Sequence, residues 1–334
     1  MPAKQTNAAI DEGAAVADAR FRLLDRLGAL VGLGPDSWMR QRLSAWWDGH
    51  DLPERPAESA APQATASAEK KDDPRRLLPD RWSPDRIKVS ELIWSDGFTF
   101  PGGAEHVLKL VKPLGLTKER TILDLGSGLG GAARLIAKTF GTWVTGMEAS
   151  PTLAKAGMFA SEMAGLAKRA PIEWFDPRTV VLQAKKYDAV FARLVFLSLA
   201  DKKRLLAEIY KALKPGGQLM FIEFVLRAKD ATGPKVQAWV SGEEQKPELW
   251  TLDEYKNALA SSRFDVRVTE DITAEFRGLV LEGWKRLAQN LQPKALKAEE
   301  IASLTREIEL WSRRIGALDS GDLRMVRLTG LKNA

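Results

Sequence analysis

Short apolar runs alternate with amphipathic stretches from Thr121 to the C-terminal end of the sequence. The apolar runs predict strands and the amphipathic stretches predict helices. The predicted strands are residues 121–125, 143–148, 172–175, 187–192, 218–224, 265–270 and 323–330. Strands that alternate with helices are typical of an α/β fold, so we expect a seven-stranded, mostly parallel sheet with helices on both faces.

The stretch between the last two predicted strands, about 273–320, is predicted to be a helical insertion. Its apolar residues recur at alternating steps of three and four: Ile301, Leu304, Ile308, Trp311, Ile315 and Leu318. Such a narrow apolar seam indicates packing against another helix, for which the N-terminal helices are one candidate.

The N-terminal third predicts three units before the main domain at 114–334. Residues 1–50 show helical spacing and are predicted to form a helical extension, whereas the Pro-, Ala- and Ser-rich residues 51–80 indicate a flexible linker. In residues 81–113, Ser83-Pro84-Asp85 is typical of a helix start. That helix, the loop SDGFTFPGG and a second helix at 104–111 predict a lid.

Composition excludes several kinds of site. With no cysteine and two histidines, disulfides, thiolate zinc sites, iron–sulfur clusters and a multi-histidine metal site are not expected. The net charge of +6 comes from basic residues interleaved with acidic ones, which favours a solvated surface over nucleic-acid binding. No signal peptide or transmembrane span is predicted, so we expect a cytoplasmic protein and leave peripheral membrane contact open.

A glycine-rich turn follows the first predicted strand, in TILDLGSGLGG at 121–131. Glycines let the backbone turn sharply and approach a ligand, and the following helix offers unpaired amides. Gly126, Gly128 and Gly131 also satisfy GxGxxG, with Glu148 at the spacing of a ribose-binding acid. This loop alone therefore leaves a nicotinamide dinucleotide and S-adenosylmethionine (SAM) as alternatives.

Two further features favour SAM. Asp124, two residues before the first glycine, suits a ligand with an ammonium and a sulfonium better than one with a pyrophosphate. A strand from Tyr187, a helix, the turn at 214–217 (KPGG) and another strand then follow. Together these segments resemble the class I SAM-dependent methyltransferases, particularly the group of ubiquinone/menaquinone C-methyltransferases and small-molecule or sterol methyltransferases. The resemblance extends over residues 94–224 and implies a Rossmann-like fold.

The resemblance implies a set of cofactor-binding residues. They are Trp94, Asp124, Gly126, Ser127, Gly128, Gly130, Glu148, Ala149, Asp176 and Arg193. The glycine turn would hold the methionine end of SAM, Glu148 both ribose hydroxyls and Asp176 the adenine amino group. Glu148 as a surface acid and Asp176 as a turn former are the alternatives. Arg193 would bind the SAM carboxylate, an anionic substrate or a structural partner.

The segment 94–103 resembles the aromatic loop that covers SAM in the sterol and phosphoethanolamine branches. At least one of Trp94, Phe98 and Phe100 is expected to face the sulfonium, because an aromatic face favours positive charge. The alternative is that these rings fill a hydrophobic seam. Phe98 and Phe100 are also predicted to contact the acceptor, together with Phe196 and Trp284.

Methyl transfer needs a general base only if the acceptor loses a proton. Glu223, at the end of a central strand, and His106, after the aromatic loop, are the candidate bases, although each could be structural. Related enzymes often carry a histidine after the fourth strand, where this chain has Phe196 and Ser198. This departure indicates an apolar acceptor pocket.

The sequence therefore predicts an enzyme that transfers a methyl group from SAM to a small apolar or amphipathic acceptor, such as a quinone precursor, an isoprenoid, a lipid or an aromatic metabolite. The alternatives are a SAM-binding partner protein without catalysis and an NAD-dependent oxidoreductase. The Asn/Asp-Pro-Pro-Tyr signature of enzymes that methylate nucleic acids is absent. Homo-oligomers through the helical extensions are a further expectation.

Overall fold

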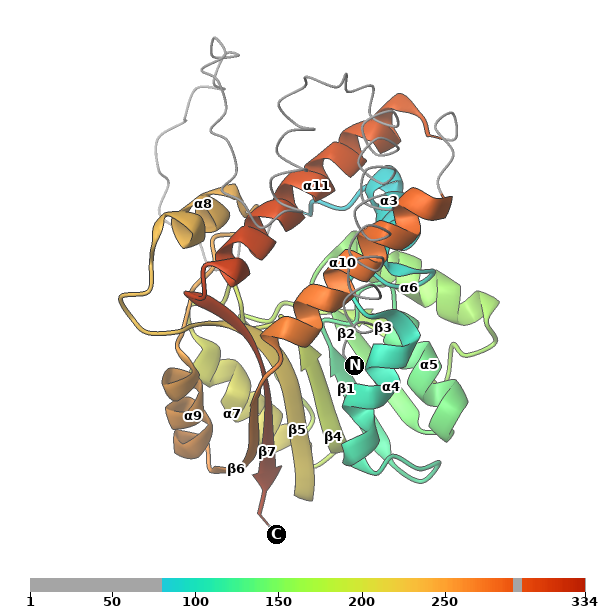
Figure 1. Ribbon diagram of the computed structural model, residues 1–334. Helices are drawn as coiled ribbons and strands as arrows, with labels where there is room; N and C mark the ends of the chain where they lie inside the picture. The colour runs from blue at the N-terminus through green and yellow to red at the C-terminus, as the bar shows by residue number, and fades with distance from the viewer. Residues whose placement is uncertain (1–79, 291–295, 334) are drawn as a thin grey trace, which may run out of the picture.

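A computed structural model describes residues 80–290 and 296–333 of the 334-residue chain. The helical extension predicted at 1–50 lies outside the described residues, as does the predicted linker at 51–80 apart from Asp80. The described residues contain one sheet whose strand order is β3-β2-β1-β4-β5-β7-β6 (Figure 1). The first helices lead into this sheet, and the last strand runs down the left part of the sheet in this view to the end marked C.

The sheet confirms the predicted seven-stranded, mostly parallel arrangement. Its strands are β1 Thr121–Leu125, β2 Trp143–Glu148, β3 Ile172–Trp174, β4 Tyr187–Arg193, β5 Leu213–Leu226, β6 Phe264–Asp271 and β7 Leu323–Lys332. Strands β1 to β5 pair in parallel, whereas β7 lies antiparallel between β5 and β6. The carboxyl ends of the parallel strands therefore meet at one edge, where ligands of α/β sheets bind.

The predicted turn at 214–217 lies inside β5 as a bulge. The pairing with β4 passes from Tyr187–Leu213 to Ala189–Gln218, so several residues of β5 face one residue of β4. Gly216 has φ 72°, and a Cβ on Gly217 would lie 2.8 Å from the Lys214 carbonyl oxygen. The glycines thus permit the irregularity, and the strand resumes on both sides of it.

Helices cover both faces of the sheet, as predicted. One face packs on α4 (Gly103–Val111), α5 (Gly131–Phe140) and α6 (Pro151–Met163), and the short 3-10 helix Lys112–Leu114 follows α4. The other face packs on α7 (Lys202–Ala212) and α9 (Leu252–Ser261). Side chains alternate along β1, since Ile122 belongs to the first core and Leu123 to the second.

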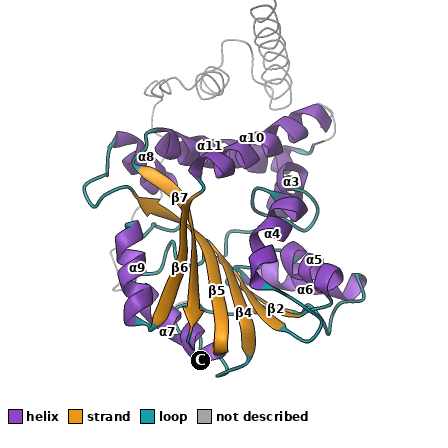
Figure 2. Cartoon of the chain, turned by 60° about the horizontal axis from the view of Figure 1, so that its bottom comes forward, coloured by secondary structure: helices purple, strands orange, loops and turns teal. Residues whose placement is uncertain are grey.

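Four helices form a roof above the carboxyl ends of the strands (Figures 1 and 2). They are α3 (Pro84–Trp94), α8 (Pro234–Gly242), α10 (Thr273–Asn290) and α11 (Ala298–Asp319). Helix α3 begins where the sequence predicts, because the Ser83 hydroxyl accepts a hydrogen bond from the Arg86 amide at 3.2 Å. Helices α10 and α11 follow β6 and precede β7, where the sequence predicts a helical insertion.

The apolar seam of α11 is largely buried. Leu304, Ile308, Trp311 and Ile315 are all at most 4% exposed. Helix α11 packs against α3 and α8. The Trp311 ring of the seam also packs on Phe276 of α10, so α11 contacts the other three helices of the roof.

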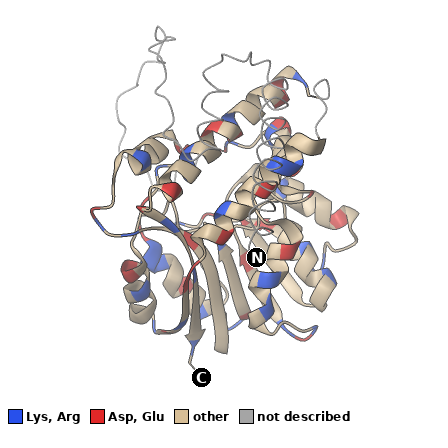
Figure 3. Ribbon diagram, viewed as in Figure 1, with Lys and Arg blue, Asp and Glu red and all other residues tan. Residues whose placement is uncertain are grey.

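Charged residues are mixed over the molecule. In Figure 3, lysine and arginine alternate with aspartate and glutamate along the helices and do not gather on one face in this view. Within residues 80–290 and 296–333, no helix is long and apolar enough to cross a membrane. The same ranges contain no cluster of three or more histidine, aspartate or glutamate residues that could hold a metal ion.

Candidate functional site

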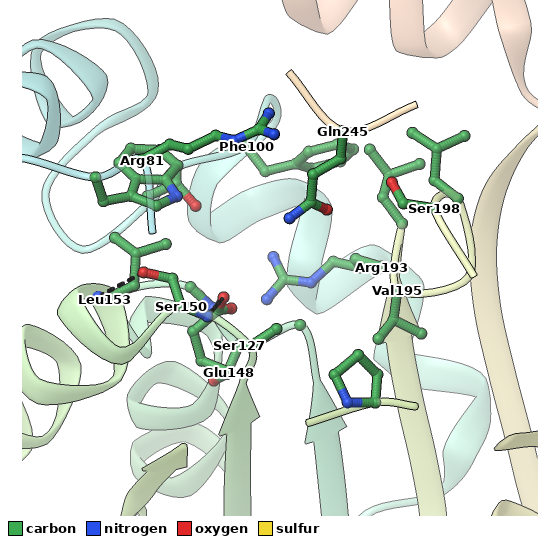
Figure 4. Close-up of a pocket in the computed structure, with 18 of the residues that line it drawn as sticks. Arg81, Phe100, Ser127, Glu148, Ser150, Leu153, Arg193, Val195, Ser198 and Gln245 are labelled. Atoms are coloured by element: carbon green, nitrogen blue, oxygen red, sulfur yellow. Dashed lines mark hydrogen bonds between the residues drawn. The ribbon is translucent and has the colours of Figure 1, made fainter. Parts of the chain in front are cut away.

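A cavity of about 340 Å³ lies between the carboxyl ends of the strands and the roof (Figure 4). Its floor comes from the glycine loop Gly126–Gly128, from Glu148 at the end of β2 and from the segment after β4. The aromatic loop forms one side, and the roof contributes residues before α3, after α8 and on α11. The cavity thus brings together segments that the sequence predicts to bind ligands.

The glycine loop can adopt its course only because it lacks side chains at two positions. Gly126 and Gly128 have φ of 71° and 57°. A Cβ on Gly126 would lie 2.8 Å from the Arg193 carbonyl oxygen, and one on Gly128 would lie 2.7 Å from Thr99 Oγ1. The loop is therefore packed between the end of β4 and the aromatic loop, with its backbone on the cavity wall. Gly130 lies behind it, as the N-cap of α5.

Glu148 is buried at the cavity wall, 9% exposed. Its Oε2 accepts a hydrogen bond from the Gly128 amide at 2.8 Å, and its Oε1 accepts one from the Ser150 amide at 2.9 Å. Burial raises the pKa of this carboxyl group, although the backbone donors favour the ionised form. Each oxygen retains a lone pair, so the carboxylate can still accept from a diol. Its neighbour Ala149 also lines the cavity.

Asp124 lies beneath the glycine loop and is fully buried. Its Oδ2 accepts from the Ser127 hydroxyl at 2.8 Å, whereas its Oδ1 has no hydrogen-bond partner and lies 3.5 Å from Arg193 Nη2. Burial raises the pKa of the carboxyl group. Asp124 does not line the cavity, whereas Ser127, which donates to it, does.

Arg193 ends β4 and points its guanidinium into the cavity (Figure 4). Its side chain is only 7% exposed, and Nε has no hydrogen-bond partner. The ring of Phe191 lies 5.0 Å from the guanidinium carbon. A buried cation with unused donors is a favourable binding partner for a carboxylate or phosphate.

Asp176 is held by its own turn. Arg178 donates to its carboxylate from the backbone amide at 2.9 Å and from Nη2 at 2.8 Å, which lowers the pKa of Asp176. The Val180 amide also bonds to the Asp176 carbonyl oxygen at 2.9 Å. Its neighbours Phe175 and Pro177 line the cavity, but Asp176 does not. The adenine role of Asp176 remains a prediction.

The predicted aromatic residues divide between the cavity and the core. Phe98 and Phe100 line the cavity. Trp94 is 1% exposed, and its ring centroid lies 4.9 Å from that of Trp311 and 6.0 Å from that of Trp284. These three indoles pack together inside the roof, so the structure does not bring Trp94 or Trp284 to the cavity wall.

Phe196 also lies in the core, since its ring centroid is 5.2 Å from that of Phe221. The two candidate bases are likewise away from the wall. Glu223 is fully buried and accepts from the amides of Phe196 and Phe224 at 3.1 and 3.0 Å. His106 is 5% exposed, with Nδ1 3.4 Å from Glu275 Oε1. Neither side chain lines the cavity, so the geometry lends no support to a role as base.

An ionic network in the roof was not anticipated from the sequence. Arg86 pairs with Glu307 of α11 at 2.8 Å and with Glu244 at 2.9 Å. Arg314 of α11 pairs with Glu243 at 2.7 Å. Apart from Glu307, these side chains line the cavity. Their partners lie 71 to 221 residues away in the chain, so no local pattern announces them.

Comparisons with known proteins agree with this architecture. A family model described as a methyltransferase domain matches residues 101–268, half of the 334 residues. Phosphoethanolamine N-methyltransferase of Plasmodium falciparum is 25% identical over 240 residues, which cover 71% of this chain and 87% of that protein. Phosphoethanolamine N-methyltransferase 2 of Caenorhabditis elegans is 28% identical over 241 residues, 70% of this chain and 52% of that protein.

A solved structure shares the fold. Phosphoethanolamine N-methyltransferase 2 of Haemonchus contortus, in complex with phosphomonomethylethanolamine and S-adenosylhomocysteine, superposes with a TM-score of 0.65 at 22% identity. The match covers 75% of this chain and 58% of that chain. The chain thus spans little more than half the length of the two nematode proteins. Of the two cofactors left open by the glycine loop, the family match favours SAM.

Proposed function

Because this chain belongs to the class I SAM-dependent methyltransferases, we propose that its acceptor is a small molecule with an anionic group, of the phosphoethanolamine type. The chain is an enzyme, and its cofactor is SAM. The observation that carries the proposal is the buried Arg193 guanidinium, which points into the cavity with Nε unpaired.

The residues around the glycine loop suit SAM. We assign Gly126 and Gly128 to the close approach of the backbone, and Glu148 to the ribose hydroxyls. We assign the ammonium to the Asp124 carboxylate, which lies behind the cavity wall with Oδ1 free of hydrogen bonds and 3.5 Å from Arg193 Nη2. These assignments agree with the expectations from the sequence.

Bound SAM supplies a methyl group already activated on a sulfonium, so the protein mainly has to align the acceptor and exclude water. The roof and the aromatic loop line the cavity over the carboxyl ends of the strands. Phe98 and Phe100 present aromatic rings to it, which favours positive charge nearby. No side chain is assigned as a general base.

An anionic acceptor agrees with both the cavity and the relatives. Arg193 offers charge, while Leu197, Leu310 and Phe100 offer apolar surface in the same cavity. The relatives named above act, by name, on phosphoethanolamine. A quinone precursor, one of the acceptors expected from the sequence, has no counterpart among these relatives. A cytoplasmic location and homo-oligomers through the helical extensions stay predictions.

The test compares two acceptors that differ only in the phosphate. Transfer of labelled methyl from SAM is measured with phosphoethanolamine and with ethanolamine, after binding of S-adenosylhomocysteine has been established by calorimetry. We expect turnover with phosphoethanolamine and little with ethanolamine. Equal rates for the two, or turnover only with an uncharged isoprenoid or quinone precursor, would overturn the anionic acceptor.

A further inference from the structure

The loop between β4 and α7, residues 194–199, forms one side of the cavity, and we name it the cavity loop. Leu194, Val195, Leu197 and Ser198 line the cavity, whereas Phe196 between them points into the core. Leu194 has φ 52°, in the left-handed region that a leucine seldom adopts. Such a backbone persists only where its surroundings hold it.

Two buried charged side chains bind the main chain of this loop from below. The Phe196 amide donates to Glu223 Oε2 at 3.1 Å, and the Phe196 carbonyl oxygen accepts from Lys202 Nζ at 2.7 Å. Lys202 Nζ also donates to the Leu199 carbonyl oxygen at 2.7 Å. Both polar groups of Phe196 are therefore held by opposite charges, one from β5 and one from the first turn of α7.

The burial of these charges is unfavourable by itself. Lys202 and Glu223 are each 0% exposed. Burial lowers the pKa of Lys202 to about 8 and raises the pKa of Glu223 to about 8, while each charge stabilises the other. A buried pair of this kind is weak evidence for stability, because apolar residues of similar volume often serve a core equally well. Its hydrogen bonds to the cavity loop indicate a specific conformational role instead.

The rest of the loop is anchored on both sides of this pair. The Phe196 ring packs edge-on against Phe221 and lies 6.2 Å from the ring of Tyr255. The Leu197 carbonyl oxygen accepts from the Glu248 amide at 2.8 Å, which ties the loop to the segment that leads from α8 of the roof to α9. With Phe196 fixed below, its neighbours Leu197 and Ser198 are left at the wall.

We propose that Lys202 and Glu223 are positioning residues, which fix the Phe196 peptide so that Leu197 and Ser198 face the methyl acceptor. Neither residue touches the cavity, so both act through the cavity loop. This assignment deepens the proposed function and rests on it for the identity of the acceptor. It also gives Glu223 a role other than the base expected from its place in the sequence.

The test uses the full chain with the substitutions Glu223→Gln and Lys202→Met, and with Lys203→Met as a matched control on the exposed side of α7. We expect the KM for phosphoethanolamine to rise about tenfold or more in both variants, because a buried partner of the loop is lost. The dissociation constant of S-adenosylhomocysteine should change by less than about threefold, because the glycine loop is untouched. Lys203→Met should match the wild type.

Hydrogen–deuterium exchange of the amides at 194–199 supplies a second measurement that needs no acceptor. We expect faster exchange in Glu223→Gln than in wild type and Lys203→Met, with unchanged exchange in β1 and β2. If wild type does not methylate phosphoethanolamine, the proposed acceptor fails while the exchange result still decides the role of the pair. Should Lys202→Met not fold, Glu223→Gln decides alone, since glutamine fills the same volume.

Two outcomes would overturn the proposal. Unchanged exchange at 194–199 in Glu223→Gln would mean that the carboxylate does not hold the loop. If the KM for phosphoethanolamine and the dissociation constant of S-adenosylhomocysteine rise by the same factor, the substitutions loosen the whole fold rather than this loop.

Discussion

The floor and the roof of the cavity are built in different ways. On the floor, hydrogen bonds join residues that are close in the chain: Asp124 and Ser127 are 3 residues apart, and Gly128 and Glu148 are 20 apart. In the roof, Arg86 reaches Glu244 and Glu307, which are 158 and 221 residues away. A binding site for a cofactor shared by a family can be carried by a short motif, whereas the roof over the cavity depends on distant pairs.

The largest expected effect tests the roof. In Arg86→Met, the buried Glu307 loses its cation, and we expect the free energy of unfolding in urea to fall by about 3–5 kcal/mol. The control is Arg277→Met, which breaks the half-exposed pair with Asp319 at a similar distance of 2.7 Å. That loss should be at most about 1 kcal/mol. Equal losses in the two variants would remove the distinction between buried and surface pairs.

The next effect tests the floor. Glu148→Ala removes the carboxylate that holds the glycine loop and that we assign to the ribose, so binding of S-adenosylhomocysteine should weaken by about 1.5–3 kcal/mol. Calorimetric titration measures this loss. Glu173→Ala, on the exposed face of β3, is the control and should bind normally. An unchanged dissociation constant in Glu148→Ala would contradict the assignment.

A smaller effect is expected at Arg193, which points into the cavity between the floor and the roof. Arg193→Lys keeps the positive charge but loses the planar set of donors, so the KM for phosphoethanolamine should rise roughly tenfold. Any residual activity with ethanolamine should stay as in wild type, because that molecule lacks the phosphate. If the KM changes equally for phosphoethanolamine and ethanolamine, Arg193 does not bind the phosphate.

The smallest effect concerns Asp176. The hydrogen bonds from Arg178 lower its pKa, so its stabilising contribution is present above the ordinary value of 3.8 and is lost as the pH falls below it. Asp176→Asn should therefore reduce the free energy of unfolding at pH 7 by up to about 1 kcal/mol. In urea titrations at about pH 3 the difference from wild type should shrink. If the free energies of unfolding of wild type and Asp176→Asn differ as much at low pH as at pH 7, the charge of Asp176 does not cause the difference.

The Asp176→Asn variant also tests cofactor binding on the floor of the cavity. Since the Asp176 carboxylate is already engaged by Arg178, S-adenosylhomocysteine affinity should change less than about threefold in Asp176→Asn. A larger loss would restore the contact with adenine that the sequence predicts.

The sequence predicted the sheet well because its strands are short apolar runs with local boundaries. β1 and β2 have the predicted ends, and Ser83 caps α3 as expected. The positions of the aromatic side chains were harder to predict. Phe98 and Phe196 look alike in a sequence, yet one lines the cavity and the other packs on Phe221. Only tertiary contacts separate these two uses of a large apolar ring.

The partners of charged residues were the feature that the sequence predicted least well. Arg86 and Arg314 stand on helices among ordinary surface charges, and nothing nearby in the sequence marks Glu307 or Glu243 as their partners. Glu223 was singled out because it lies near the end of a central strand, but its partner Phe196, and Lys202 that holds the same peptide, come from the preceding loop and helix. The sequence pattern singled out Glu223 but did not indicate its role.

Strand β7 follows β6 in the chain yet lies between β5 and β6 in the sheet. During synthesis, β6 therefore has no neighbour in the sheet until residues 323–332 have left the ribosome. The two long helices of the roof emerge before that strand, which both of them contact in the folded protein. A nascent chain that has not yet reached β7 would expose an unpaired sheet edge at β5, a surface on which chaperones would be expected to act.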